Sequence, residues 1–260
     1  MRWVKLLLFA AFLGGAWRLY EYNEWMSLKG YRIEAEDQTL ERRFWDVFPV
    51  RSLRFWPFLL KDAGGVEAFL ERVLPVSVST RMSEFGRFVT TMKWLRPWLK
   101  VWWRDRLWCV SREGRMWEAD GFAGSSMSSD IKGPVWQLAS LSGDIRPLPL
   151  GVFSVPVSLD AVSAFLLEYQ DYPWFSSVER IVWDRRAGAD LFRLALVRGK
   201  QRFEVLIQQN KYGGQELGAM LEEVLGRLAK ESGNHRIDAT YEGKILLQKL
   251  PGGPNEGSLK

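Results

Sequence analysis

The stretch LFRLALVRGKQRFEVLIQ, residues 191–208, decides the fold of this chain. Large apolar side chains alternate along both of its halves, which is the period of a β-strand with one buried face. Gly199-Lys200, between the halves, suits a tight two-residue turn. The pattern predicts strands over 191–198 and 202–208, in which Phe192, Leu194 and Leu196 face Phe203, Val205 and Ile207.

The sequence on both sides of this hairpin supplies two helices and further strands. The strongest helix is expected over 214–231, where the apolar stripe consists of Leu217, Met220, Leu221, Val224, Leu225 and Leu228. RIDATY at 236–241 and KILLQKL at 244–250 predict a final hairpin around Glu242-Gly243. Upstream, the pattern predicts a helix over 158–170 and a strand over 178–184. The tail at 251–260 is expected to be disordered.

The first half of the chain is patterned in the same way. Strands are expected over 31–36, 76–80 and 88–95, with a helix over 66–74 that Pro75 ends. A hairpin is expected over 107–110 and 115–118, with Gly114 in its turn. The apolar stretch from Phe44 to Leu60 is interrupted by two prolines and is left unassigned. Residues 119–134 are rich in Gly and Ser and indicate a linker.

The N-terminus carries a twelve-residue uncharged run, LLLFAAFLGGAW at 6–17, flanked by Lys5 and Arg18. A helix over 3–20 is about 27 Å long, close to the roughly 30 Å thickness of a membrane if those two cations snorkel outward. We therefore expect a single inner-membrane span with a cytoplasmic N-terminus and the bulk of the chain in the periplasm. Two alternatives stay open, a cleaved signal peptide and a buried helix of a soluble protein. The expected anchor residues are Leu6, Leu7, Leu8, Phe9, Phe12, Leu13 and Trp17.

These elements predict an α+β fold in several parts. Residues 1–25 form a short cytoplasmic end and the membrane helix, and 26–118 form a small α/β domain. Residues 119–157 hold the linker and the start of the second domain. A mixed β-sheet domain with two helices follows over 158–250 and ends in the C-terminal hairpin.

Composition removes most catalytic classes. The net charge of +5 is too small to require a polyanionic partner, so nucleic acid is an unlikely ligand. Cys109 and His235 are the only residues of their kinds, which leaves no disulfide and no zinc site built from Cys and His. His235 is expected on the surface or at a cap. We predict no enzyme, no catalytic residues, no metal and no cofactor, with a carboxylate-based enzyme as the residual alternative.

The most unusual stretch is 94–117, which holds six of the fourteen tryptophans. Basic residues interleave with them. Such a pattern favours strand positions with the indoles in the core and the cations in water. A protein or membrane interface is the second reading, and single-stranded nucleic acid is the third.

The order of these elements resembles the FtsQ/DivIB family of bitopic cell-division proteins. Leu95-Arg96-Pro97 and the turn at Gly114 stand where the family has a proline motif and a Gly turn. Trp94 and Leu99 replace the family's glutamate and alanine. Near the C-terminus, Ile237-Asp238-Ala239-Thr240-Tyr241 resembles a family motif in which Thr240 stands in place of an arginine.

The resemblance implies a POTRA domain over 26–118 and a non-catalytic, membrane-anchored scaffold of the division septum. Its implied partners are FtsB/DivIC-like and FtsL-like coiled-coil proteins, which would add an extended segment to the final edge strand. The implied contact residues are Thr240, Tyr241, Ile245, Leu246, Leu247 and Gln248. Two alternatives are a POTRA-containing module of a protein export or outer-membrane assembly system, and a membrane-tethered nucleic-acid-binding protein.

Overall fold

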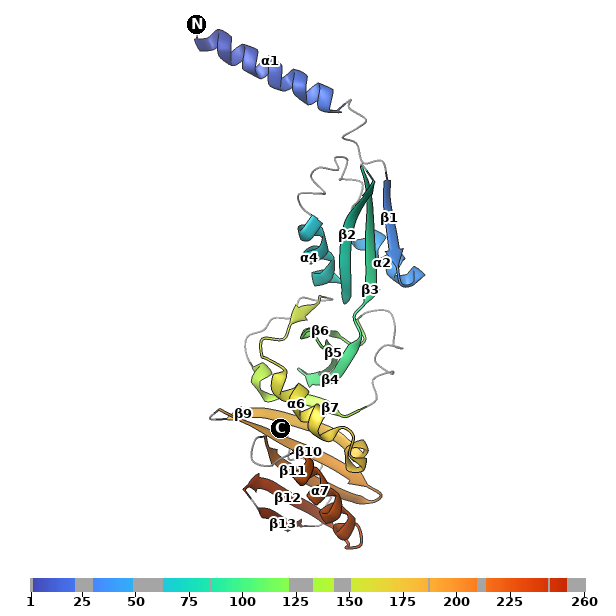
Figure 1. The fold of residues 1–260 in the computed structure, drawn as a ribbon, viewed down its shortest axis with the longest axis vertical. Helices are drawn as coiled ribbons and strands as arrows, with labels where there is room; N and C mark the ends of the chain where they lie inside the picture. The colour runs from blue at the N-terminus through green and yellow to red at the C-terminus, as the bar shows by residue number, and fades with distance from the viewer. Residues whose placement is uncertain are drawn as a thin grey trace. The chain divides into compact units, whose positions relative to one another are not determined.

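The fold is taken from a computed structural model, which describes residues 2–21, 30–48, 63–84, 86–121, 133–142, 151–186, 188–209, 214–242 and 244–251. The chain divides into two compact units, Met1–Leu95 and Arg96–Lys260. Each unit has a β-sheet of its own (Figure 1).

The first unit follows helix α1 (Arg2–Glu21) with the order strand, helix, helix, strand, strand. The central strand of its sheet is β3, which pairs in parallel with β1 and antiparallel with β2. The elements are β1 (Gly30–Ala35), α2 (Gln38–Val47), α4 (Ala63–Val73), β2 (Val76–Glu84) and β3 (Arg87–Trp94).

Helix α2 begins where Asp37, in extended conformation, accepts a hydrogen bond from the Leu40 amide at 2.7 Å. This is an N-cap, which satisfies one of the unpaired amides of the first turn. Leu40 and Phe44, four residues apart, are fully buried, and the Phe44 ring stacks on Tyr31 of β1. The aromatic contact therefore fixes α2 against the sheet.

The second unit is built on a ten-stranded sheet in the order β13-β12-β11-β10-β9-β7-β4-β5-β6-β8. Three pairs are parallel, β11 with β12, β7 with β9 and β4 with β7, and the others are antiparallel. The strands are β4 (Pro97–Trp103), β5 (Arg106–Ser111), β6 (Arg115–Glu118), β7 (Val135–Leu138), β8 (Phe153–Ser154), β9 (Val178–Arg186), β10 (Ala189–Arg198), β11 (Gln201–Gln208), β12 (Asn234–Tyr241) and β13 (Lys244–Leu250).

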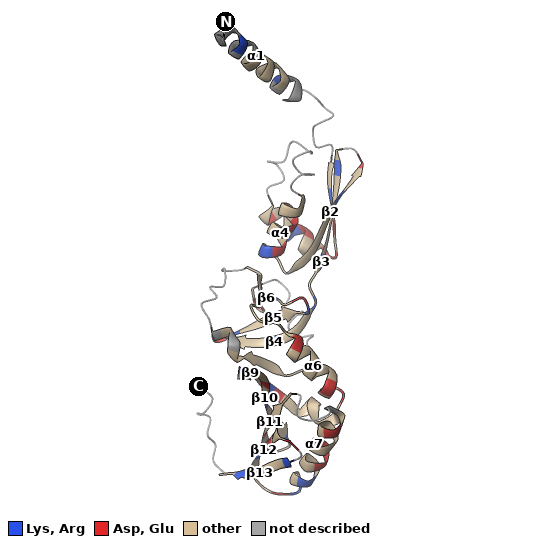
Figure 2. Cartoon of the chain, turned by 60° about the vertical axis from the view of Figure 1, so that its left-hand side comes forward, with Lys and Arg blue, Asp and Glu red and all other residues tan. Residues whose placement is uncertain are grey.

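Helices α6 (Asp160–Tyr169) and α7 (Gly214–Leu228) lie on the same side of this sheet (Figure 2). Residues of the short 3₁₀ helices η2 (Ala139–Ser142) and η3 (Pro173–Ser177) also belong to its core. Alternate strand residues and one stripe of each helix form a single core. Phe165 of α6 stacks on Phe192 of β10 with ring centroids 4.1 Å apart. Helix α7 connects the parallel strands β11 and β12 as a crossover, and its Leu217, Leu221 and Leu225 are fully buried.

Several local predictions are confirmed. The 191–208 hairpin forms with Leu194 opposite Val205 and Leu196 opposite Phe203. The final hairpin is present as β12 and β13, and the hairpin around Gly114 as β5 and β6. Helix α7 ends at Leu228, earlier than expected.

The predicted fold class is wrong. No helix in the described part of the chain is long and apolar enough to cross a membrane. The uncharged run at 6–17 rises only about 18 Å as a helix, well short of a bilayer's roughly 30 Å hydrocarbon core. The prediction of a membrane anchor is therefore wrong, and so is the predicted inner-membrane localisation with the bulk of the chain in the periplasm. The expected anchor residues were Leu6, Leu7, Leu8, Phe9, Phe12, Leu13 and Trp17. The described chain is mostly β, with more residues in strands than in helices.

The boundary between the units lies between Leu95 and Arg96, earlier than the expected end of the first domain at 118. The reason is that β4, β5 and β6 join the second sheet through the parallel pairing of β4 with β7. Most of the expected linker and of the tail lies outside the described residues, as does 49–60 of the unassigned apolar stretch.

Candidate partner-binding edge

Strand β13 is the last strand of the ten-stranded sheet, and among the described residues its pairing partner is β12 alone. An edge strand presents the N–H and C=O groups of alternate residues away from its neighbour. In the described part of the chain, no side chain hydrogen-bonds the amides of Ile245–Leu250. Within the described part of the chain, this edge is therefore open to pairing over most of the strand.

The predicted contact residues lie on this edge or at the turn before it. Tyr241, Leu246 and Leu247 are 53%, 50% and 53% exposed, and Gln248 is exposed as well. Ile245 is half-buried and packs against the core. The structure therefore brings five of the six predicted residues to the edge strand or its turn.

Thr240, the sixth residue, already has local partners. Its hydroxyl donates to Asp238 Oδ1 at 2.6 Å, and its amide donates to the same oxygen at 3.0 Å. The Thr240 side chain therefore stabilises the end of β12, where the pairing register shifts between Asp238 and Tyr241.

The two exposed leucines of β13 lie on opposite faces of the sheet. Leu247 is paired with the fully buried Ile237, so it lies on the face that the helices cover. Leu246 is paired with Asp238 and lies on the other face. An added strand would therefore meet an apolar side chain of β13 on each of its own faces.

A ladder of charged side chains lies next to the edge, on the open face of the sheet, which is the face that carries Leu246 and lies opposite the helices. The Glu204 carboxylate of β11 is 2.7 Å from the Arg236 guanidinium of β12 and 3.4 Å from Arg193 Nε of β10. Arg236 lies directly opposite Gln248 of β13. Sequence reasoning missed this cluster because the parallel register of β11 and β12 is not encoded in either strand alone. The only available signal was the outward position of Glu204 in its hairpin.

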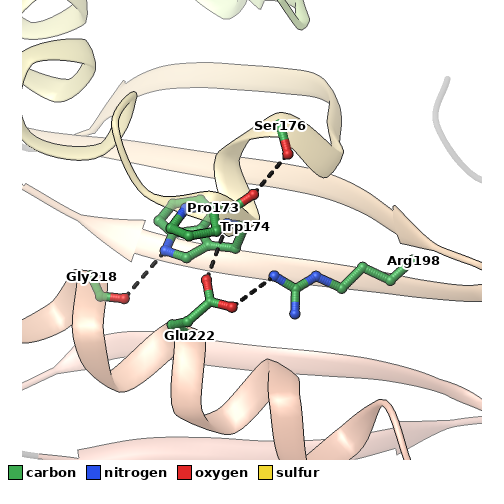
Figure 3. A network of polar contacts seen from close by, with 6 residues as sticks. All are labelled: Pro173, Trp174, Ser176, Arg198, Gly218 and Glu222. Atoms are coloured by element: carbon green, nitrogen blue, oxygen red, sulfur yellow. Dashed lines mark hydrogen bonds and ion pairs between the residues drawn. The ribbon is translucent and has the colours of Figure 1, made fainter.

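A polar network holds α7, the helix under this edge, in place (Figure 3). The Glu222 carboxylate accepts the Trp174 amide at 3.1 Å and pairs with the Arg198 guanidinium at 3.1 Å. The Trp174 indole donates to the Gly218 carbonyl at 3.2 Å. These contacts join α7 to η3 and to the end of β10, so the strands next to the edge rest on a fixed support.

His235 is buried, contrary to the expected surface position. It belongs to β12 and stacks on Phe203 of β11, with ring centroids 6.0 Å apart. Its Nε2 is 3.6 Å from Glu231 Oε2, and its Nδ1 has no hydrogen-bond partner among the described residues. The single imidazole is therefore buried between Phe203 and the Glu231 carboxylate.

The tryptophan-rich stretch belongs mainly to the core. Trp103, Trp108 and Trp117 are buried, and the first two indoles donate to the carbonyls of Leu141 and Trp103. Trp102, at 46% exposed, is the most exposed indole of the stretch. The core interpretation thus holds for three of the six tryptophans, and the half-buried Trp98 packs against the same core.

Grooves lie in the described part of the second unit. One groove has a volume of about 610 Å³ and is lined by Trp98, Lys100, Arg112 and Asp171, among others. Burial raises the pKa of Glu168, which borders a separate depression with Asp171. Among the described residues, no three His, Cys, Asp or Glu side chains are grouped closely enough to hold a metal ion.

Comparison with known proteins adds no identification. No protein-family model matches the chain, and no curated protein matches it.

Proposed function

We propose that this chain is a non-catalytic scaffold that captures an extended segment of a partner protein by strand addition at β13. The observation that carries the proposal is the open edge of β13, seven residues long with exposed leucines on both faces. Proteins usually protect such edges with short strands, bulges, charges or covering elements, because an exposed apolar edge templates pairing with another chain. Strand β13 carries Lys244 and Lys249 near its two ends, whereas Ile245–Gln248 between them is uncharged. This uncharged stretch is what supports β13 as a recognition surface.

The resemblance to the FtsQ/DivIB family assigns this edge a biological context. The order β1-α2-α4-β2-β3, followed by a larger sheet that ends in a hairpin, supports that resemblance. On this basis we assign the chain to cell division and septum formation. The proposed partners are FtsB/DivIC-like and FtsL-like coiled-coil proteins, which would supply the added strand.

A binding experiment on the full chain tests the proposal. The probes are the coiled-coil domains of the FtsB/DivIC-type and FtsL-type proteins from the same cell. Leu246→Lys places a charge on the open face of the edge, and Leu246→Pro removes a strand amide. We expect each variant to weaken capture at least tenfold. The matched control is Leu167→Lys, because Leu167 is an exposed leucine of α6 in the same unit.

The outcomes separate the alternatives. Equal capture by the wild type and by a folded Leu246→Lys variant would contradict a site at β13. No capture by the wild-type chain with both partners present would contradict the division role. That result would favour the alternative of a POTRA-containing export or assembly module.

A further inference from the structure

The sheet of the first unit has an edge strand, β2, whose outward amides differ from those of β13 in having hydrogen-bond acceptors. Strand β2 lies at the end of the order β1-β3-β2 and pairs antiparallel with β3. Helix α4 lies alongside it (Figure 1). In an antiparallel pair, every second residue directs its amide away from the neighbouring strand. On β2, the amides directed away from β3 include those of Val76, Val78 and Thr80.

All three of these amides already have acceptors. The Thr80 amide donates to Glu67 Oε1 at 2.6 Å, and the Val78 amide donates to Glu71 Oε1 at 3.2 Å. Both carboxylates belong to α4 and are four residues apart, so they lie on one face of the helix. The Val76 amide donates to the Leu74 carbonyl at 2.9 Å. The donors that a new strand would need are therefore occupied.

A hydroxyl chain across the sheet fixes Thr80 in this register. Thr80 Oγ1 is 2.9 Å from the hydroxyl of Thr90 on β3, which is fully buried. Thr90 Oγ1 is in turn 2.5 Å from the Tyr31 hydroxyl on β1. Burial raises the pKa of Tyr31, and the charge of Glu67 acts in the same direction. The three strands and the Glu67 carboxylate thus form one connected polar network.

We infer that helix α4 holds the β2 edge closed, so that no extended segment can pair with Val76–Thr80 without first displacing the Glu67 and Glu71 carboxylates. A charge-assisted hydrogen bond is roughly twice as strong as a neutral one, so a neutral peptide carbonyl is a poorer acceptor for these amides. The inference is independent of any partner at β13. It concerns only the first unit.

Amide hydrogen exchange on the full chain, read residue by residue, is the first test. In the wild type we expect the Val78 and Thr80 amides to exchange as slowly as Ser77 and Ser79, which pair with β3. In Glu67→Ala/Glu71→Ala, exchange at Val78 and Thr80 should accelerate at least tenfold, while Ser77 and Ser79 change little. Fast exchange of Val78 and Thr80 in the wild type would overturn the inference.

Peptide addition is the second test. The probe is a capped synthetic peptide with the sequence of residues 76–84, which can pair with a β2 edge in antiparallel fashion. We expect chemical-shift changes along β2 in Glu67→Ala/Glu71→Ala and none in the wild type. Peptide pairing with β2 of the wild type would overturn the inference, and so would its absence from the folded double-alanine variant.

Two further variants control for charge and for misfolding. Glu84→Ala removes a carboxylate from the same strand, where its side chain pairs with Arg87 and caps no outward amide, and it should leave β2 closed. Glu67→Gln/Glu71→Gln retains a side-chain carbonyl acceptor at each position and should keep the edge at least partly closed. If the alanine variant fails to fold, wild-type exchange and the glutamine variant still decide the question. Fast exchange of Val78 and Thr80 in the wild type, or complete loss of their protection in the folded glutamine variant, would contradict the closure of this edge by Glu67 and Glu71.

Discussion

Gly218 in helix α7 offers a sharp test of how the second unit is held together. A Cβ atom at this position would overlap the ring of Tyr172, far inside van der Waals contact. The Tyr172 ring stacks on Trp174 with centroids 6.3 Å apart, and its hydroxyl donates to the Gln215 carbonyl at 3.0 Å. Gly218→Ala must therefore move the ring and disturb both contacts, next to the network of Figure 3.

The magnitude follows from opposing contributions. Replacing Gly by Ala in a helix interior is favourable by about 1 kcal/mol. Overpacking a well-packed site costs about 1–3 kcal/mol, and losing the tyrosine hydrogen bond costs about 1 kcal/mol. The net destabilisation is about 2 kcal/mol. For a unit of this size it corresponds to a fall in Tm of about 4–8 °C.

Gly226 provides a matched control, because it lies in the same helix and has no atom within 4 Å of a built Cβ. Gly226→Ala should raise Tm by a few degrees through helix propensity alone. Thermal unfolding followed by circular dichroism measures both variants. In a Tyr172→Ala background the clash is absent, so Gly218→Ala should become neutral or stabilising. A Gly218→Ala protein at least as stable as the wild type, with Tyr172 present, would refute the reasoning.

Two other predictions concern titratable groups. Burial opposes ionisation of Asp37, but hydrogen bonds from the Leu40 amide and the Trp94 indole together lower its pKa below the usual 3.8. Its contribution to stability is thus present above pH 3.8 and lost as pH falls through the lowered value. Asp37→Ala should cost about 1 kcal/mol at pH 7 in urea unfolding, and Asp37→Asn should flatten the acid decline. Burial raises the pKa of Cys109 to about 11. Native Cys109 should therefore react with iodoacetamide at pH 8 at least a hundredfold more slowly than in the urea-unfolded chain, and equal rates would contradict its buried position.

The elements that the sequence predicted well are those whose pairing is local. In the 191–208 hairpin, a two-residue turn and strict alternation fix both the register and the buried face. Helix α7 shows a long apolar stripe, which is the same whether the helix ends at 231, as expected, or at Leu228. These patterns depend on neighbours within about twenty residues, and a single sequence displays them directly.

The elements that were missed lack such local signals. Helix α2 has only two buried positions of its own, Leu40 and Phe44, so its period is too short to separate from the proline-broken segment that follows. The turn between β4 and β5 uses Arg104 and Asp105 with φ of 50° and 59°, where glycine or asparagine is expected. The turn residues therefore do not indicate the hairpin of β4 and β5. The sequence shows β4 only as part of the tryptophan-rich stretch at 94–117.

The candidate edge shows the same division between local and distant information. The sequence indicates the final hairpin, and Leu246 and Leu247 of its second strand are exposed. That these residues contact a partner stays a prediction. That β13 is the terminal strand of the sheet depends instead on the parallel crossover through α7, which puts β12 beside β11. The buried position of His235 follows from the same crossover, because it places the imidazole on Phe203.

The two sheets together suggest how this chain distinguishes one edge from another. A partner strand gains most from backbone hydrogen bonds, and every chain can supply these, so side-chain contacts alone discriminate weakly between edges. Occupying the donors of β2 with Glu67 and Glu71 removes that general attraction at one edge. The amides of Ile245–Leu250 on β13 have no such acceptors among the described side chains. Selectivity between the edges then comes from which backbone amides are already hydrogen-bonded to side chains of the same chain. A peptide that pairs only with β13 in the wild type should therefore acquire a second site on β2 in Glu67→Ala/Glu71→Ala. An unchanged single site in that variant would show that β2 is closed by something other than these carboxylates.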